Sequence, residues 1–165
     1  MTEEQEILGT PTYKYKTDPY KHQRIALNRG GLLENFAYFM EMGTGKTKVA
    51  IDNASYLYQQ KEIKEVIVIA PNSVYRNWIA EISTHSPITP YTWVWKVDKP
   101  KALDKASQSN DLIYILANVE AMSHRSGWKW LETRLRLNGS KTLLILDEST
   151  TIKNPGAIRT KHLCR

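Results

Sequence analysis

Residues 40–47 read MEMGTGKT, a glycine-containing turn between an apolar run and a stretch with helical periodicity. The run 36–40 predicts a strand, and the apolar positions of 46–60 recur at spacings of three and four, as on one face of a helix. Gly43 and Gly45 let the backbone turn its amide groups inward toward phosphate oxygens, and the helix adds its positive N-terminus. The sequence therefore predicts a phosphate-binding loop between a strand and a helix.

The side chains of this loop favour a nucleoside triphosphate as the ligand. We expect Lys46 to reach the β- and γ-phosphates and the Thr47 hydroxyl to ligate a magnesium ion. Met40 stands where the pattern usually has its first glycine, and a glycine turn without a ligand is the structural alternative. The residues expected to hold the nucleotide at this loop are Met42, Gly43, Thr44, Gly45, Lys46 and Thr47.

An acidic pair, Asp147 and Glu148, follows the most apolar run of the chain at 142–146. Charged groups at the end of a buried strand cost free energy unless an ion compensates them. We expect Asp147 to hold the magnesium through water and Glu148 to polarise the water that attacks the γ-phosphate. Two solvated acids at a strand end are the alternative, which the Gly-Lys-Thr sequence upstream disfavours.

Short apolar runs alternate with amphipathic stretches along the rest of the chain. Asp18 and Pro19 predict the start of a helix that Gly30 and Gly31 end. Further strands are predicted at 66–70, 91–97, 111–116 and 142–146, and further helices at 74–83, 119–122 and 128–137. This alternation predicts an α/β fold with a mostly parallel sheet and helices on both faces. Ligands of such sheets bind at the carboxyl ends of the strands.

Composition narrows the class of protein. The chain of 165 residues is 41% hydrophobic and 24% charged, as expected for one globular domain. Its apolar runs are shorter than the ~18 residues of a membrane span, and its one cysteine, Cys164, excludes an internal disulfide framework. We therefore expect an intracellular protein with no membrane partner. The net charge of +6 suits a polyanionic partner, although solubility alone also accounts for such an excess.

Six short stretches form an ordered series along the chain. They are PYKHQ at 19–23, EMGTGKT at 41–47, VIAPNSV at 68–74 with Asn77, Trp78 and Glu81 after it, ANVEAM at 117–122, DESTTIKN at 147–154, and Arg159-Thr160-Lys161. The first five resemble, in order, motifs Q, I, Ia, Ib and II of the superfamily-2 helicases, and the last falls where the following helix begins. Within that superfamily the chain is most similar to the Swi/Snf-type DNA translocases, whose motifs I and II are usually EMGLGKT and DEAHRIKN.

This resemblance implies a RecA-like P-loop lobe that binds ATP and Mg²⁺, with nucleic acid, and double-stranded DNA in particular, as the partner. It implies that Gln23 reads the adenine with its side-chain amide. In the stretch that resembles motif Ia, Ser73, Arg76 and Asn77 are the candidates for hydrogen bonds to a phosphate backbone. For Arg76, a solvated helix face is an equal alternative.

The chain departs from the family pattern in two ways. Ser149 and Thr150 replace the usual Ala-His, so the histidine that couples the site to motif III is missing. No motif III follows, and the second RecA-like lobe, which supplies arginine fingers in such motors, is expected on a longer protein. Residues 18–165 are thus expected to form the first lobe, after a flexible arm at 1–17. Alone, this lobe should bind nucleotide weakly and hydrolyse it slowly.

Three functions remain open from the sequence. The first is the ATP-binding lobe of a DNA helicase or double-stranded DNA translocase that moves by ATP hydrolysis. The second is a stand-alone regulatory module that binds nucleotide or nucleic acid without motor activity. The third, an unrelated P-loop ATPase or kinase, is disfavoured because the separation of Lys46 from Asp147 leaves room for the strands of a helicase lobe.

Four tryptophans form two Trp-x-Trp pairs, at 93 and 95 and at 128 and 130. Such rings stack on bases in proteins that bind single strands. They are also large apolar groups that fill cores and interfaces, and this second role is favoured.

Overall fold

The computed structural model describes residues 13–31, 33–72, 74–95, 98 and 100–147. These residues form two compact units. The first comprises the described residues of 1–62 together with 78–89, and the second those of 63–77 and 90–165. Each unit has a hydrophobic cluster of its own. None of the helices in these ranges is long and apolar enough to cross a membrane.

The second unit is built on a parallel sheet, which has four strands within the described residues. They are β1 (Glu65–Ala70), β2 (Tyr91–Val94), β3 (Ile113–Asn118) and β4 (Thr142–Leu146), in the order β2-β3-β1-β4. Ile67 of β1 lies in register with Ile115 of β3 and with Leu144 of β4. Every residue of β1 is buried, as is usual for a central strand of a parallel sheet. The predicted parallel α/β sheet is confirmed.

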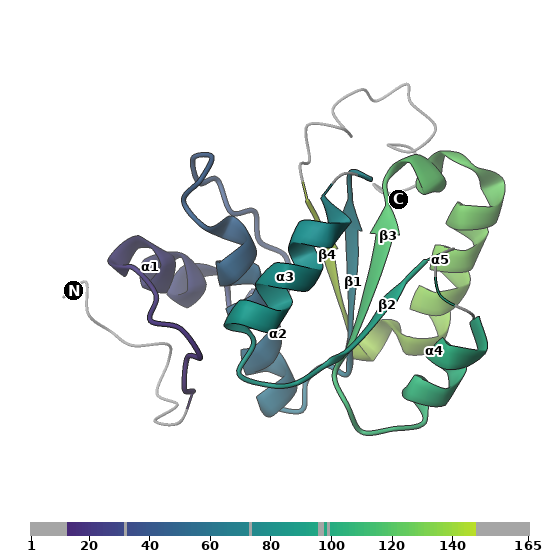
Figure 1. The fold of residues 1–165 in the computed structure, drawn as a ribbon, viewed down its shortest axis with the longest axis horizontal. Helices are drawn as coiled ribbons and strands as arrows, with labels where there is room; N and C mark the ends of the chain where they lie inside the picture. The colour runs from purple at the N-terminus through teal and green to yellow at the C-terminus, as the bar shows by residue number, and fades with distance from the viewer. Residues whose placement is uncertain (1–12, 32, 73, 96–97, 99, 148–165) are drawn as a thin grey trace. The chain divides into compact units, whose positions relative to one another are not determined.

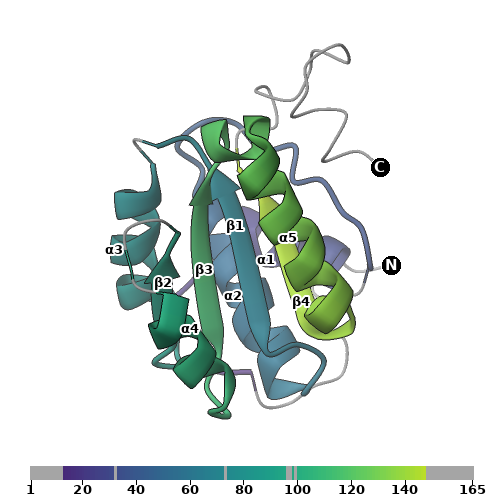
Figure 2. The same cartoon turned by 90° about the vertical axis from the view of Figure 1, so that its right-hand side faces the viewer.

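Two helices, α4 (Pro100–Ser107) and α5 (Arg125–Asn138), lie on the same face of this sheet (Figures 1 and 2). Two 3-10 turns flank α5, η2 (Glu120–Ser123) after β3 and η3 (Gly139–Lys141) before β4. Leu103 of α4 and Leu131 of α5 join the cluster that contains Ile67, Ile115 and Trp93 of the sheet. Alternate residues of each strand thus supply one hydrophobic layer between the sheet and these helices.

A buried ion pair fixes α5 to the start of β1. Arg134 Nε donates to the two carboxylate oxygens of Glu65 at 3.1 and 2.9 Å, and Nη2 donates to the same carboxylate and to Ser107 Oγ. The Arg134 and Glu65 side chains are 14% and 4% exposed. Because both charges are largely removed from water, removal of either partner is expected to destabilise the fold.

The first unit contains α1 (Lys21–Gly30), α2 (Lys46–Gln59) and the part of α3 (Tyr75–His85) from Trp78 onward (Figure 1). Its cluster is formed by Leu27 of α1 with Val49 and Tyr56 of α2. Val49 and Tyr56 are seven residues apart, two helical turns, so they share one face of α2. This packing fixes α2 against α1, and α2 carries the glycine loop at its N-terminus.

The strand predicted at 36–40 is wrong. The backbone there makes tight local bonds, from Phe39 N–H to the Ala37 carbonyl at 3.1 Å and from Met40 N–H to the Tyr38 carbonyl at 3.0 Å. Tyr38 and Met40 pack against the cluster of the first unit, whereas Phe39 is 96% exposed. The alternation of a strand is therefore present in this segment, but these amides bond locally and not to a neighbouring strand.

Several predicted boundaries also differ from the structure. The helix predicted from Asp18 begins at Lys21, since Gln23 Oε1 accepts the Tyr20 amide and makes Tyr20 the N-cap. The strand predicted at 91–97 ends at Val94, the strand predicted at 111–116 is Ile113–Asn118, and the helix predicted at 119–122 is the 3-10 turn η2. The prediction misses α4, an eight-residue helix with only two buried positions, Leu103 and Ala106.

Candidate phosphate-binding site

The two glycines of the loop both have left-handed backbone. Gly43 and Gly45 have φ values of 77° and 81°, in the left-handed region that other residues adopt only with strain. Gly45 is the N-cap of α2, and it provides no side-chain hydrogen bond to the first amides of this 14-residue helix. Because such amides lack partners within a helix and carry its positive pole, they suit an anion.

Lys46 points its ammonium group back at the loop. Its Nζ donates to the carbonyl oxygens of Met40 and Glu41, each at 2.9 Å. The Thr44 hydroxyl donates to the same Glu41 carbonyl at 2.6 Å, while the Met42 side chain is 93% exposed. The carbonyls of the loop are thus gathered around the lysine.

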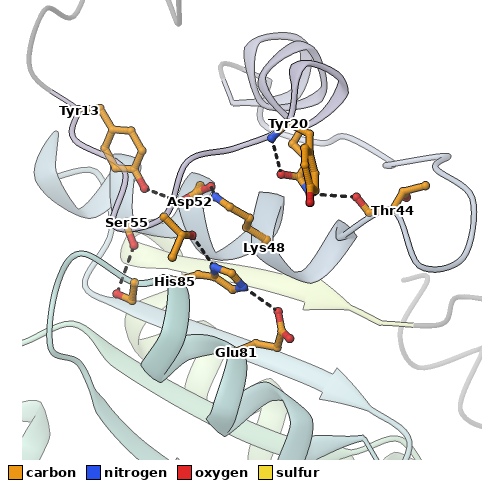
Figure 3. Close-up of polar contacts among 11 residues, drawn as sticks. Tyr13, Tyr20, Thr44, Lys48, Asp52, Ser55, Glu81 and His85 are labelled. Carbon is orange, nitrogen blue, oxygen red and sulfur yellow. Dashed lines mark hydrogen bonds and ion pairs between the residues drawn. The ribbon is translucent and has the colours of Figure 1, made fainter.

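The start of α1 contacts the opposite side of the loop. Gln23 Nε2 donates to the Thr44 carbonyl at 3.0 Å, and Gln23 Oε1 accepts the Tyr20 amide at 3.0 Å. His22 Nε2 also lies 3.0 Å from the Thr44 carbonyl, and the His22 ring stacks on Tyr20 at 5.7 Å. In Figure 3, dashed lines join the labelled Tyr20 and the labelled Thr44 to the side chain that lies between them. The structure therefore brings Gln23 together with Thr44 and Gly45 of the loop.

A buried polar network lies further along α2. Lys48 Nζ donates to Asp52 Oδ2 at 2.6 Å, and the Tyr13 hydroxyl donates to Asp52 Oδ1 at 2.9 Å (Figure 3). Burial raises the pKa of Asp52 above its usual range, against the lowering by Lys48 and Tyr13. Burial, followed by the charge of Asp52, raises the pKa of the Tyr13 hydroxyl. The buried pair thus holds residue 13 against the helix of the glycine loop.

Tyr15 and Thr17, which follow Tyr13 in the chain, also make side-chain contacts within the first unit. Lys48 Nζ lies 5.3 Å from the centre of the Tyr15 ring, within cation–π range. Thr17 Oγ1 lies 2.6 Å from His85 Nδ1, and the other ring nitrogen of His85 lies 3.3 Å from Glu81 (Figure 3). Sequence reasoning missed this network, although the Lys48–Asp52 spacing of four residues is a visible signal for a helical ion pair.

Asp147 belongs to the second unit, directly after β4. Its amide donates to the Ile69 carbonyl at 2.9 Å, so the ladder with β1 extends one residue past the strand. The predicted partner Glu148 lies outside the described residues. The sharing of one magnesium by Thr47 and Asp147 stays a prediction. Within the described part of the chain, no group of three or more His, Cys, Asp or Glu side chains is arranged to hold a metal ion.

Two of the three residues predicted to contact nucleic acid lie near the start of α3. Arg76 and Asn77 are exposed in its first turn, next to the buried Trp78. Ser73 lies outside the described residues. A contact of Arg76 and Asn77 with phosphates stays a prediction.

The tryptophan pairs form part of the core of the second unit. The Trp130 ring stacks on Trp93 and on Trp95, with ring centres 6.0 and 5.6 Å apart. Trp93 is buried, and Trp95, Trp128 and Trp130 pack against its cluster. This arrangement supports a packing role for these side chains.

Comparisons with known proteins identify the family. A profile of the SNF2-related domain matches residues 21–165. The chain belongs to this family, and the predicted Swi/Snf-type resemblance is confirmed. A human relative, "SWI/SNF-related matrix-associated actin-dependent regulator of chromatin subfamily A containing DEAD/H box 1", is 30% identical over 149 residues, which cover 86% of this chain and 14% of the relative. "Protein CHROMATIN REMODELING 24" of Arabidopsis thaliana is 28% identical over 174 residues, 91% of this chain and 15% of that protein.

A solved structure supports the fold class. The chain resembles "Sulfolobus solfataricus SWI2/SNF2 ATPase core in complex with dsDNA" with a TM-score of 0.69 and 24% identity, over 92% of this chain and 30% of that one. This likeness concerns the fold, and it confirms the predicted RecA-like α/β class. The chain spans about one seventh of the length of the relatives above, 14% and 15%.

Proposed function

We propose that this chain is the ATP-binding lobe of a nucleic-acid-dependent ATPase, which moves on double-stranded DNA when joined to a second RecA-like lobe. The observation that carries the proposal is the glycine loop, with two left-handed glycines directly before Lys46 and Thr47 at the N-terminus of α2. Membership in the SNF2-related domain family supports the ATPase class. An intracellular location follows from the DNA partner.

The loop residues suit the phosphates of MgATP. Lys46 would exchange the carbonyls of Met40 and Glu41 for β- and γ-phosphate oxygens, and the first amides of α2 would bind the same oxygens. Thr47 and Asp147 would hold the magnesium, the latter through water, and the ion would neutralise charge that develops on the phosphates. Glu148 would orient the attacking water.

Charge and exposure support a DNA partner. The net charge of +6 favours a polyanion, and Arg76 and Asn77 are exposed where donors to a phosphate backbone are expected. The solved relative is described as a complex with double-stranded DNA. If the basic excess serves DNA, the affinity for a duplex will fall steeply as salt rises from about 50 to 200 mM. An affinity that does not depend on salt would favour solubility as the reason for the charge.

The nucleotide proposal is tested by calorimetric titration of the chain with MgATP. Lys46→Ala should abolish binding, because it removes the cation that meets the β- and γ-phosphates. Lys64→Ala, in the second unit, is the control and should bind as the unaltered chain does. In the full-length protein, Glu148→Gln should keep ATP binding and stop turnover. Unchanged ATP affinity after Lys46→Ala would refute the assignment of the loop.

A further inference from the structure

We propose that residues 13–17 form a strap that holds the start of α1 against the start of α2, and that Tyr15 of this strap is a positioning residue for ATP. The inference rests on the proposed nucleotide function and deepens it. The start of α1 carries Gln23, which the family resemblance assigns to the adenine, and α2 begins at the phosphate loop. The strap therefore links the two helix ends that are expected to bind opposite ends of one nucleotide.

The strap covers part of the first unit with alternate side chains. Tyr13, Tyr15 and Thr17 are partly buried, whereas the two lysines between them are exposed. The Tyr13 ring meets the rings of Tyr15 and of Tyr56 on α2 edge to face, with ring centres 4.8 and 6.2 Å apart. This alternation is typical of an extended segment that turns one side toward the protein.

Both ends of the strap are anchored. The Tyr13 hydroxyl donates to Asp52 of α2 at 2.9 Å, and the Asp52 side chain is 2% exposed (Figure 3). At the other end, Thr17 Oγ1 lies 2.6 Å from Nδ1 of His85, the last residue of α3. Tyr15 follows one anchor and precedes the other, so its ring is held in place from both sides along the chain.

Tyr15 contacts a cation from each of the two helices. The Nζ atom of Lys48 on α2 lies 5.3 Å from the centre of the Tyr15 ring, and the guanidinium carbon of Arg24 on α1 lies 5.7 Å from it. Both distances are within cation–π range. Lys48 directly follows Thr47, and Arg24 directly follows Gln23. Each cation is thus the sequence neighbour of a residue that is expected to bind the nucleotide.

This link between the helices matters only to a ligand that reaches both of them. A phosphate chain held by the loop alone does not sense the position of α1. ATP, in contrast, binds fully only when the start of α1 lies at the correct distance from the loop. The apparent affinity for ATP falls with the fraction of molecules that keep this arrangement. The strap therefore contributes to the affinity for ATP through the position of α1.

Two ligands distinguish positioning from general support of the fold. We would titrate MgATP and magnesium tripolyphosphate, which has no base, into the unaltered chain, into Tyr15→Leu and into Tyr15→Phe. Positioning predicts that Tyr15→Leu lowers the affinity for MgATP about three- to tenfold and leaves that for tripolyphosphate unchanged. Tyr15→Phe keeps the ring and should bind both ligands as the unaltered chain does. Equal losses for the two ligands, no loss for ATP, or a loss for Tyr15→Phe as large as that for Tyr15→Leu would overturn the proposal.

A second variant keeps the test decisive if Tyr15→Leu does not fold. Arg24 is exposed, so Arg24→Gln removes one of the two cations without opening the core. It should lower the ratio of ATP affinity to tripolyphosphate affinity about two- to fivefold. Arg29→Gln is the matched control, because it removes the same charge from the last turn of the same helix. Equal ratios for these two variants would refute the role of the Tyr15 contact.

A measurement without ligand separates the strap from the proposed function. The amides of Gln23 and Arg24 donate to the Tyr20 carbonyl at 3.0 and 3.1 Å, in the first turn of α1. In Tyr15→Leu these two amides should exchange with solvent faster than in the unaltered chain, while the amides of β1 keep their rates. Equal exchange in the two proteins would refute the strap. If the unaltered chain binds neither ligand, the proposed function fails, and the exchange rates still decide whether the strap holds α1.

Discussion

The hydroxyl of Tyr13 donates a hydrogen bond to Asp52, 2.9 Å away and 39 residues later in the chain. The acceptor is one of the two partners in the buried ion pair on α2, whose first residue is Lys46 of the glycine loop. Residue 13 therefore belongs to the structure that supports the loop, although it lies far from it in the sequence.

Tyr13→Phe should destabilise the chain by about 1–3 kcal/mol, because it removes a donor from a buried carboxylate and adds nothing in its place. The free energy of unfolding in urea measures this effect. Tyr20→Phe is the control, since Tyr20 is 71% exposed, and it should change stability far less. Equal stability of the two variants would show that water or another group replaces the Tyr13 hydroxyl.

Gly45→Ala should be more damaging than Gly43→Ala. Both place a side chain at positive φ, which costs about 1–2 kcal/mol, but only the Cβ at 45 meets Gln23 Nε2. We therefore expect a further loss of stability and of MgATP affinity for Gly45→Ala alone. Urea unfolding and calorimetry on the two variants check this order, and the reverse order would contradict the close packing at Gly45.

Arg134→Ala should cost about 3 kcal/mol or more, because it leaves the Glu65 carboxylate buried without its cation. Arg136→Ala, two positions along the same helix, is the comparison. Its side chain is 78% exposed in an ion pair with Glu132, and such pairs contribute about 0–1 kcal/mol. Similar losses for the two variants would mean that Glu65 finds another partner or water.

Tyr38 should make stability depend on alkaline pH. Its hydroxyl is buried without a hydrogen-bond partner among the described residues, and burial raises its pKa from 10.0 to about 12. The unfolded chain loses this proton first, so the stability from the neutral hydroxyl is complete below pH 10 and is lost as pH rises toward 12. Tyr38→Phe should therefore lose less stability across that range in urea unfolding, and an identical pH profile would argue against this origin.

Much of the sheet was predictable because β1 and β4 contain continuous apolar runs, which are typical of strands in a parallel sheet, although only β1 is fully buried among the described residues and β4 is partly buried. The loop was predictable because Gly43 and Gly45 are the residues that left-handed backbone favours. The structure of the segment before the loop, 36–40, was not predictable. Its sequence pattern shows which side chains turn inward, but it does not show whether another strand pairs with the backbone.

The side chains that contact the loop and α2 from other segments also could not be predicted from the sequence. Gln23 and Tyr13 reach the loop and α2 through side-chain contacts that span more than one element, and no periodicity marks such contacts. The family resemblance assigns Gln23 to the base, and this assignment stays a prediction, whereas the bond of Gln23 to the Thr44 carbonyl is not something that a motif records.

The register of the sheet also determines the order in which this chain can fold. Glu65 at the start of β1 pairs with Ile113 and with Thr142, so the central strand must wait for residues far downstream before it gains either neighbour. Closing such long loops makes parallel pairing slow compared with helix formation. During synthesis the helices α1 and α2 can form early, while the apolar β1 stays unpaired and prone to aggregate until β3 and β4 have left the ribosome.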